Sequence, residues 1–513
     1  MYARIITASL YGLLSQEVRV EVDVENGFPS FTVVGLANQS IREAKERIHS
    51  AVLNSGYKFP SKRITINLSP ANKKKEGSHF DLPIAMGLLV STGQANISEK
   101  MSLETAFLGE LTLDGRLEPV EGALPLIIGM QKRGITSVVL PSQNIEEAML
   151  VKGMRLYPAD TLLKAAQHAT GFTPIQAVIA RGLSLSFKGE DIPDFSEIRG
   201  QEPVKRAALV AAGGAHGLLM IGPPGVGKTM VGKRIPGIMP PLSYKEQLAV
   251  TQVYSVAGEL SLARPMITQR PFRSPHHSMS AMAMSGGGTR PRPGEVSLAH
   301  NGVLFLDELP EFNVHTLESL RQPLEDGKVT ISRVNQTSTF PARFILVAAM
   351  NPCRCGYYSD PVKVCTCTQT ERQRYMGKIS GPLLDRIDLH ISMDRVVYKD
   401  ISLEPDKVIR KTSKELRAQV MIACEIQKDR YKKISIDYNS QLTPSLIRKH
   451  CALDEKSKAL LEDAFSMWAL SARSYHRLLK VSRTIADLEQ SDSIKEIHIL
   501  EALSYRLPDR LLK

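Results

Sequence analysis

The sequence predicts a multidomain α/β protein with a parallel β-sheet in its central domain, and three observations predict this fold class. A chain of 513 residues is too long for one hydrophobic core, which suggests roughly three domains. In the middle of the chain, the apolar runs GLLMIG, GVLFLDE and RFILVAAMN are each followed by turn and helix signals, as in a parallel sheet covered by helices. Towards the C-terminus, apolar residues recur at helical spacing.

The chain divides into four segments by its patterning. Residues 1–170 alternate β-type runs such as VRVEVDV with helical runs, which predicts a small mixed α/β domain. Residues 171–195 are polar, contain Gly and Pro, and are predicted to form a linker. We expect the parallel-sheet domain over residues 196–395 and a helical lid over residues 396–513.

Composition excludes several classes of protein. A hydrophobic fraction of 43% and a charged fraction of 23% are ordinary for a globular protein, and neither disorder nor a fibrous class is indicated. No apolar run reaches the ~18 residues of a membrane span, and the N-terminus lacks a secretory pattern, so we expect a cytoplasmic protein without a membrane partner. The net charge of +12 favours a polyanionic partner such as nucleic acid, although many soluble proteins are basic without one.

A phosphate-binding loop follows the run GLLMI. The segment fits G-x-x-x-x-G-K-T and precedes a helix predicted to begin near Met230. In this motif backbone N–H groups surround the phosphates of ATP, the lysine reaches the β- and γ-phosphates, and the threonine hydroxyl binds Mg²⁺. The expected nucleotide-binding residues are Gly222, Pro223, Pro224, Gly225, Val226, Gly227, Lys228, Thr229 and Met230.

Polar residues at the ends of two further apolar runs extend this site. Asp307 ends VLFLD and is expected to hold Mg²⁺, and Glu308 is expected to polarise the attacking water. A buried strand with a capping acid is the alternative. Asn351 ends the run RFILVAAMN and could hydrogen-bond the γ-phosphate or that water, whereas Asn before Pro is also a common turn starter.

Two arginines are candidates for completing the site from another subunit. Arg386 lies in GPLLDRIDLHI, after the sheet, and Arg473 lies in LSARSYHRLL, at the start of a predicted lid helix. A guanidinium group in such a place stabilises the charge that develops on a transferred phosphoryl group. The alternative is that both are ordinary surface residues.

With these motifs, the strings NPCRCGYYSDP, SGPLLDRIDLHI, RPFRSPHHSMSAMAM and GEVSLAHNGVLFLDELPEF resemble the magnesium-chelatase-like AAA+ family, including its competence-associated members. The likeness covers essentially the whole chain. It implies an AAA+ core, a hairpin before the sensor strand over residues 328–343 that faces the pore, and a homo-oligomeric, hexameric ring. It also implies an ATPase that translocates on single-stranded and branched DNA, promoting branch migration of recombination intermediates in natural transformation.

Three arginines are the expected DNA contacts under this resemblance. Arg333 lies near the polar tip of the hairpin, where the resemblance implies a basic residue facing DNA in the pore. Arg290 and Arg292 lie in the Gly-rich basic stretch SGGGTRPRPG, which suits a loop that touches phosphates. An arginine at a solvated hairpin edge and an ordinary surface loop are the alternatives.

The first domain resembles the Lon-type proteolytic domain, which has the ribosomal S5 domain 2-like fold, through FLGELTLDGRLEPVEGALPLIIGMQKRGITSVVLP. In that alignment the Lon lysine falls on Leu126, and the serine position corresponds to Gly77-Ser78-His79. We therefore expect a non-proteolytic domain used for assembly or DNA contact. A run of three lysines ending at Lys75 suits DNA contact but is most often a solvated face.

Four cysteines form a candidate zinc site over residues 352–368. Cys353, Cys355, Cys365 and Cys367 supply the number and softness of ligands that tetrahedral Zn²⁺ prefers. Their C-x-C spacing is tighter than the C-x-x-C of zinc ribbons, and reduced free thiols are the alternative.

The sequence offers two alternative functions. A chelatase-type motor would remodel a protein partner that inserts Mg²⁺ into a porphyrin, and it gives no role to the basic hairpin or to the Lon-like domain. An ATP-dependent protease is disfavoured by the missing lysine.

Overall fold

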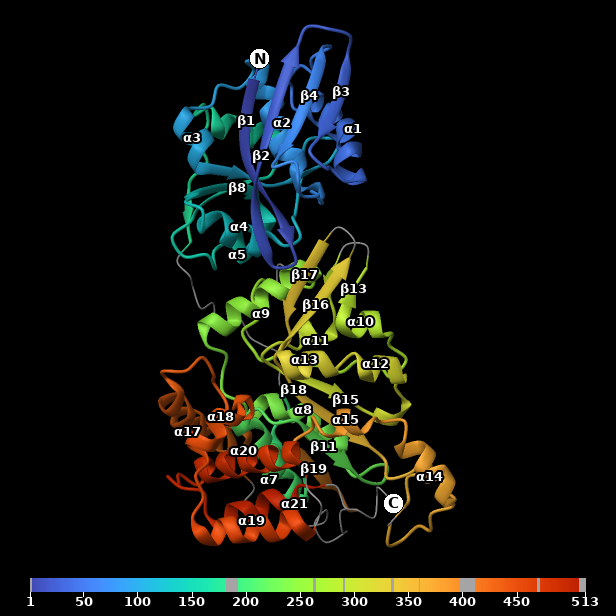
Figure 1. The fold of residues 1–513 in the computed structure, drawn as a ribbon. Coiled ribbons are helices and arrows are strands. Elements are labelled where there is room, and N and C mark those ends of the chain that lie inside the picture. The colour runs from blue at the N-terminus through green and yellow to red at the C-terminus, as the bar shows by residue number, and fades with distance from the viewer. Residues whose placement is uncertain are drawn as a thin grey trace.

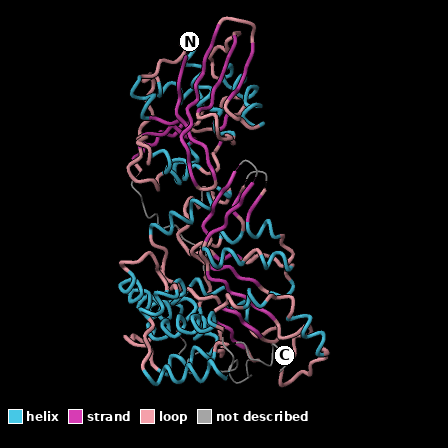
Figure 2. The backbone as a smooth tube through the Cα atoms, in the orientation of Figure 1, coloured by secondary structure: helices cyan, strands magenta, loops and turns pink. Residues whose placement is uncertain are grey.

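The computed structural model describes residues 2–180, 192–261, 264–288, 291–333, 336–358, 360–395, 411–467 and 471–506. Figure 1 shows the first domain at one end of the molecule, while the helical lid lies beside the sheet domain towards the other end. Figure 2 shows the strands concentrated in the first two units and helices filling the third. No helix among the described residues is both long and apolar enough to cross a membrane.

The first domain is built on an eight-stranded mixed sheet with the order β10-β9-β8-β5-β1-β2-β4-β3. The β-type run VRVEVDV lies in a strand with one buried face, because every second residue from Val18 to Val24 is buried. Its strands are β1 (Tyr2–Tyr11), β2 (Leu14–Glu25), β3 (Ser30–Val34), β4 (Arg63–Ser69), β5 (Thr105–Phe107), β8 (Ser137–Pro141), β9 (Arg155–Ala159) and β10 (Val178–Ile179), with a separate pair β6 (Glu110–Leu111) and β7 (Leu117–Glu118).

Six helices accompany this sheet. They are α1 (Gln39–Asn54), α2 (Asp81–Ser91), α3 (Glu99–Glu104), α4 (Ala123–Gln131), α5 (Ile145–Ala148) and α6 (Leu162–Ala169). Short 3₁₀ turns, η1 (Ser78–Phe80) and η2 (Ser142–Asn144), precede α2 and α5. The mixed α/β character expected for residues 1–170 is thus present.

Both ends of the segment expected to be a linker belong to folded units. Strand β10 pairs antiparallel with β9, so the first sheet extends past residue 170. At the other end, Phe195 is 1% exposed within the core of the second unit, and its N–H donates to Ser413 Oγ at 2.8 Å. Polar composition concealed these contacts because single residues, rather than a periodic run, make them. Residues 181–191 lie outside the described residues.

The second unit contains the predicted parallel sheet. Its order is β12-β15-β18-β11-β19, and every pairing is parallel. The three central strands are fully buried, which explains their unbroken apolar sequences. The strands are β11 (Leu218–Ile221), β12 (Phe272–Arg273), β15 (Val303–Leu306), β18 (Ile345–Met350) and β19 (Leu389–Ser392).

Helices and two hairpins surround this sheet. The helices are α7 (Glu202–Gly214), α8 (Lys228–Ile238), α9 (Tyr244–Ala257), α10 (Ala281–Ser285), α11 (Glu295–Leu298), α12 (Val314–Glu318), α13 (Arg321–Asp326), α14 (Gln369–Met376) and α15 (Gly381–Leu384), with 3₁₀ turns η3 (Phe195–Glu197) and η4 (Leu309–Glu311). The hairpins are β13–β14 (Gly286–Gly287, Arg292–Pro293) and β16–β17 (Lys328–Arg333, Gln336–Pro341). A hairpin within residues 328–343 is therefore present.

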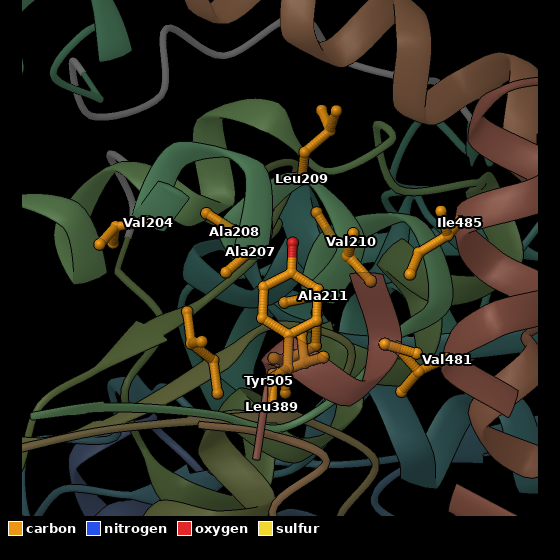
Figure 3. Close-up of a cluster of buried hydrophobic side chains, with 14 of the residues drawn as sticks. Val204, Ala207, Ala208, Leu209, Val210, Ala211, Leu389, Val481, Ile485 and Tyr505 are labelled. Atoms are coloured by element: carbon orange, nitrogen blue, oxygen red, sulfur yellow. The ribbon is translucent and has the colours of Figure 1, made fainter. Parts of the chain in front are cut away.

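From residue 411 onwards, the described segments form helices. They are α17 (Ser413–Tyr431), η6 (Asn439–Gln441), α18 (Pro444–His450), α19 (Glu455–Met467), α20 (Ala472–Leu488) and α21 (Glu496–Ser504). Residues of α7 face Val481 and Ile485 of α20 and Tyr505 in one apolar cluster (Figure 3). The lid therefore shares its core with the sheet domain, so movement of one is transmitted to the other.

The first domain packs against both hairpins of the second unit. The tip of β1–β2 carries Leu10 and Leu13 into the apolar cluster that contains the buried side of β16–β17. At Gly12, a Cβ atom would lie 3.3 Å from Thr339 O, so this turn touches the hairpin backbone. Beside it, the N–H of Gly122 donates to Ser255 O of α9 at 3.1 Å. The Lon-like domain is thus seated on the hairpins rather than tethered at a distance (Figure 1).

Candidate nucleotide-binding site and neighbouring groups

The phosphate loop lies between β11 and α8, and glycines allow its shape. Gly225 and Gly227 have φ of +83° and +94°, in the left-handed region that favours glycine. A Cβ atom on Gly222 would lie 2.4 Å from Met393 O, so this position requires close backbone approach. Helix α8 begins at Lys228, slightly before the predicted start at Met230, and its N-terminus faces the loop where phosphates would bind.

Lys228 is held inside this loop by three oxygen acceptors. Its Nζ donates to Gly222 O at 2.6 Å, to Pro223 O at 2.9 Å and to Asn351 Oδ1 at 3.0 Å. Burial lowers the pKa of Lys228 to about 8, partly opposed by the nearby carboxylates of Asp307 and Glu308. The lysine and the candidate sensor Asn351, far apart in sequence, therefore meet at one point.

The two carboxylates after β15 occupy different environments. Thr229 Oγ1 donates to Asp307 Oδ2 at 2.6 Å, which brings the two expected Mg²⁺ ligands together. Glu308 has φ of +52° and projects an exposed carboxylate, whose Oε2 lies 3.5 Å from Nδ1 of His277. Neighbouring parallel strands end at the same edge of the sheet, which explains this convergence.

Beside the phosphate loop lies a cavity of about 410 Å³. Its walls combine the phosphate loop with the segment before α7 and the end of β19, and they are formed by Glu197, Ile198, Arg199, Gln201, Pro224, Gly225, Val226, Gly227, Met230 and Arg395. This volume suits the base and ribose of a nucleotide. Met230 is among the residues that line this cavity.

Three residues at this site were missed by the sequence reasoning. Arg199 and Arg395 line the cavity from segments without a phosphate-binding motif, and only the folded chain brings them together. His277 lies in a string that resembles the family, but its position gave no sign of the contact with Glu308.

The two candidate arginines converge on one acidic side chain. Arg386 Nη2 forms an ion pair with Glu325 of α13, and Arg473 Nη2 lies 3.4 Å from the other oxygen of the same carboxylate. Arg386 also donates to Pro382 O at 2.7 Å. In the described part of the chain, no hydrogen bond joins either arginine to the phosphate loop of the same subunit.

Two of the three arginines expected to contact DNA lie in described strands. Arg333 ends β16 opposite Gln336, and Arg290 lies outside the described residues. Arg292, in β14, donates from Nη2 to Glu121 Oε2 of the first domain at 2.8 Å. The Arg292 guanidinium therefore links two domains here, and only half of its side chain is exposed.

One lysine of the run that ends at Lys75 is buried rather than solvated. Lys75 is 1% exposed, and its Nζ donates to Gly35 O at 3.1 Å and to Pro70 O. Burial lowers the pKa of this amine. Leu126, in the aligned position of the Lon lysine, is fully buried among apolar residues, and the hydroxyl of Ser78 donates to Glu110.

The sulfur atoms of Cys353, Cys355, Cys365 and Cys367 all lie within 4.8 Å of one another. Sγ of Cys353 is 3.4 Å from Sγ of Cys355 and 3.7 Å from that of Cys365, and the last two are 3.6 Å apart. Disulfide sulfurs would be about 2.05 Å apart. Zn–S bonds of about 2.3 Å in a tetrahedron separate the sulfurs by about 3.8 Å, so the spacing fits Zn²⁺.

Comparison with known proteins assigns the family. Models described as magnesium chelatase subunit ChlI match residues 194–401, subunit ChlI of Mg-chelatase residues 20–144, and the ChlI C-terminal region residues 410–506. The chain is 44% identical over 508 residues to competence protein ComM of Haemophilus influenzae, covering 98% of this chain and 97% of that protein.

Two further relatives extend the comparison. YifB of Escherichia coli is 41% identical over 517 residues, covering 99% of this chain and 97% of that protein. Lon protease 2 of Bacillus subtilis is 30% identical over 144 residues, 26% of each chain, which supports the Lon-like similarity. The chain belongs to the magnesium-chelatase-like AAA+ family, together with ComM and YifB.

Proposed function

We propose that the protein is an ATP-hydrolysing DNA translocase that acts as a hexameric ring and promotes branch migration of recombination intermediates in natural transformation. The proposed ATP hydrolysis is supported most directly by the site geometry, in which three neighbouring strand ends bring together Lys228, Thr229, Asp307 and Asn351. Similarity to a competence protein supports the DNA role, as does the net charge of +12. We assign the activity to the cytoplasm.

In the ATP site, each side chain has a separate role. Lys228 would exchange its carbonyl partners for the β- and γ-phosphates, while Asn351 senses the γ-phosphate or the lytic water. Thr229 and Asp307 would hold Mg²⁺, whose positive charge neutralises the phosphates. Glu308, exposed beside His277, would orient and polarise the water.

The pairing of Arg386 and Arg473 with Glu325 supports a site shared between subunits. Glu325 neutralises two guanidinium groups that have no hydrogen bond to their own phosphate loop in the described residues. A γ-phosphate bound by the neighbouring subunit would offer both arginines a stronger acceptor than the exposed carboxylate. Nucleotide binding and ring closure would then depend on each other.

The two hairpins are the proposed DNA-contacting elements. Arg333 of β16 and Arg292 of β14, together with Arg290 outside the described residues, would contact phosphates in the pore. Arg292 would have to leave Glu121 in order to bind DNA. This exchange costs little, because the Arg292–Glu121 ion pair is exposed and therefore weak. Because the first domain is seated on β16–β17, it would move with the hairpin during translocation.

We further propose that the four clustered cysteines bind a structural Zn²⁺. The sulfur spacing supports this, because the four sulfurs lie within 4.8 Å of one another and three of them are 3.4, 3.6 and 3.7 Å apart, close to the ~3.8 Å separation in a tetrahedral zinc site. The metal would tie together the two C-x-C segments. Metal analysis of the purified protein should find one equivalent of zinc per chain, and less than half an equivalent would refute the assignment.

The ATPase rate with and without branched DNA tests the main proposal. We expect stimulation by a four-way junction, and DNA binding that weakens at least about tenfold between 50 and 200 mM salt. The second candidate, favoured by the description of the matching family models, is a chelatase-type motor that remodels a protein partner. Salt-independent turnover without DNA stimulation would favour that motor and refute the translocase.

A further inference from the structure

The segment that carries the four cysteines also touches the nucleotide site. We call residues 352–368, which follow Asn351 directly, the cysteine loop. We propose that the cysteine loop, closed by its metal, positions the phosphate loop, Asn351 and Arg395 for nucleotide binding. This inference rests on the proposed Zn²⁺ site but not on the DNA role. It makes Gly356 and Asp360 positioning residues of the ATP site.

The first contact joins the cysteine loop to the phosphate loop. Gly356, immediately after Cys355, has φ of +86°, and its N–H donates to Cys353 O at 3.0 Å. A Cβ atom there would lie 2.8 Å from Cδ of Pro224 and 3.8 Å from Cγ of Asn351. The backbone beside the first two ligands is therefore packed against the phosphate loop and the candidate sensor.

The second contact fixes a wall of the nucleotide cavity. Arg395, which lines that cavity, donates from Nε to Asp360 Oδ2 at 2.6 Å, and its guanidinium lies over the ring of Tyr357 at 5.8 Å. The side chain of Asp360 is fully buried. Its other oxygen accepts the N–H groups of Val362 and Lys363, both at 2.9 Å. Asp360 thus links Arg395 to the turn inside the cysteine loop.

A metal would stabilise both contacts by closing the loop between them. Gly356, Tyr357 and Asp360 all lie between the second ligand, Cys355, and the third, Cys365. A metal bound by both C-x-C segments closes the loop between Cys355 and Cys365 and reduces its conformational freedom. Without the metal, no covalent bond joins the two segments, because all four cysteines are free thiols. Metal loss should then loosen Gly356 and Asp360 together.

The test combines variants that lose the metal with variants that keep it. Cys365→Ser with Cys367→Ser removes two ligands, whereas Gly356→Ala and Asp360→Asn retain all four. Cys424→Ser is the matched control, since Cys424 donates to Gly213 O outside the cluster. For each full-length protein, we would measure zinc content, the Kd of a fluorescent ATP analogue with Mg²⁺, and far-UV circular dichroism.

We expect the double serine variant to lose its zinc and to bind the nucleotide at least about tenfold more weakly, with the control unchanged in both. Gly356→Ala and Asp360→Asn should keep one equivalent of zinc and still bind more weakly, which separates positioning from a general folding defect. Full zinc loss with a Kd within twofold of the wild type would overturn the inference alone. Absence of zinc from the wild type would overturn the Zn²⁺ site as well, and neither result bears on DNA stimulation.

Discussion

Replacement of Glu147 by glutamine should stabilise the contact between the first domain and α9 at alkaline pH. Glu147 is 7% exposed, and burial raises its pKa from 4.5 to about 7, although a hydrogen bond from Asn144 Nδ2 at 3.2 Å opposes this. Ser255 of α9 lies beside the carboxyl group. The site therefore holds a carboxyl group that is neutral below pH 7 and a buried anion above it.

The sign and size of the effect follow from these two pKa values. Between pH 4.5 and 7, the folded protein keeps a proton on Glu147 that the unfolded chain has released. The contribution of Glu147 to the free energy of unfolding is therefore fully present below pH 4.5, falls as the pH rises through this range, and is lost above pH 7. The loss amounts to about 3 kcal/mol. Glutamine is neutral at every pH, and its single acceptor oxygen can keep the hydrogen bond from Asn144, so Glu147→Gln should recover part of this loss at pH 8.

Hydrogen exchange followed by mass spectrometry is the appropriate assay, because a chain with three units need not unfold in one step. Peptides from α4 and α9 should exchange up to about 100-fold more slowly in Glu147→Gln than in the wild type at pH 8, and equally at pH 4.5. Glu146→Gln is the control, since Glu146 is exposed on the same helix. Equal protection of the variant and the wild type at pH 8, or a wild type that gains protection from pH 5 to pH 7 after correction for intrinsic rates, would refute the reasoning.

Four other predictions concern the ATP site. Gly222→Ala should weaken nucleotide binding at least about tenfold, because its Cβ would collide with Met393 O, and unchanged binding in equilibrium titrations would contradict this. Asn351→Ala should bind ATP but turn it over at least about 100-fold more slowly, as steady-state kcat would show. Lys228→Ala should abolish turnover, and mixing it with Arg386→Ala subunits should restore some activity; no recovery in the mixture would argue against shared sites.

The sequence predicts the local parts of this molecule well and the long-range parts poorly. The phosphate loop could be found because the motif G-x-x-x-x-G-K-T follows an apolar strand, and Asp307 because a carboxylate directly follows another. The same reasoning selected Asn351, whose contact with Lys228 needed only the rule that parallel strands end together. These features are encoded within a few consecutive residues.

Other features depend on partners that are distant in sequence. Nothing near Arg395 indicates that it lines the nucleotide cavity, because Asp360 and Tyr357 hold it there. Lys75 looked like part of a solvated run, yet backbone carbonyl groups from two other turns surround its amine. The pairing of Arg292 with Glu121 required knowledge of how the first domain is seated. Charge and polarity alone do not identify such partners.

ATP-dependent branch migration of a labelled four-way DNA junction tests the central claim most directly. The wild-type protein with ATP and Mg²⁺ should convert the junction into two duplexes, while Lys228→Ala should bind the junction without converting it. Conversion that is equally fast without ATP, or a wild type that hydrolyses ATP but leaves the junction intact under the same conditions, would contradict the proposed translocase.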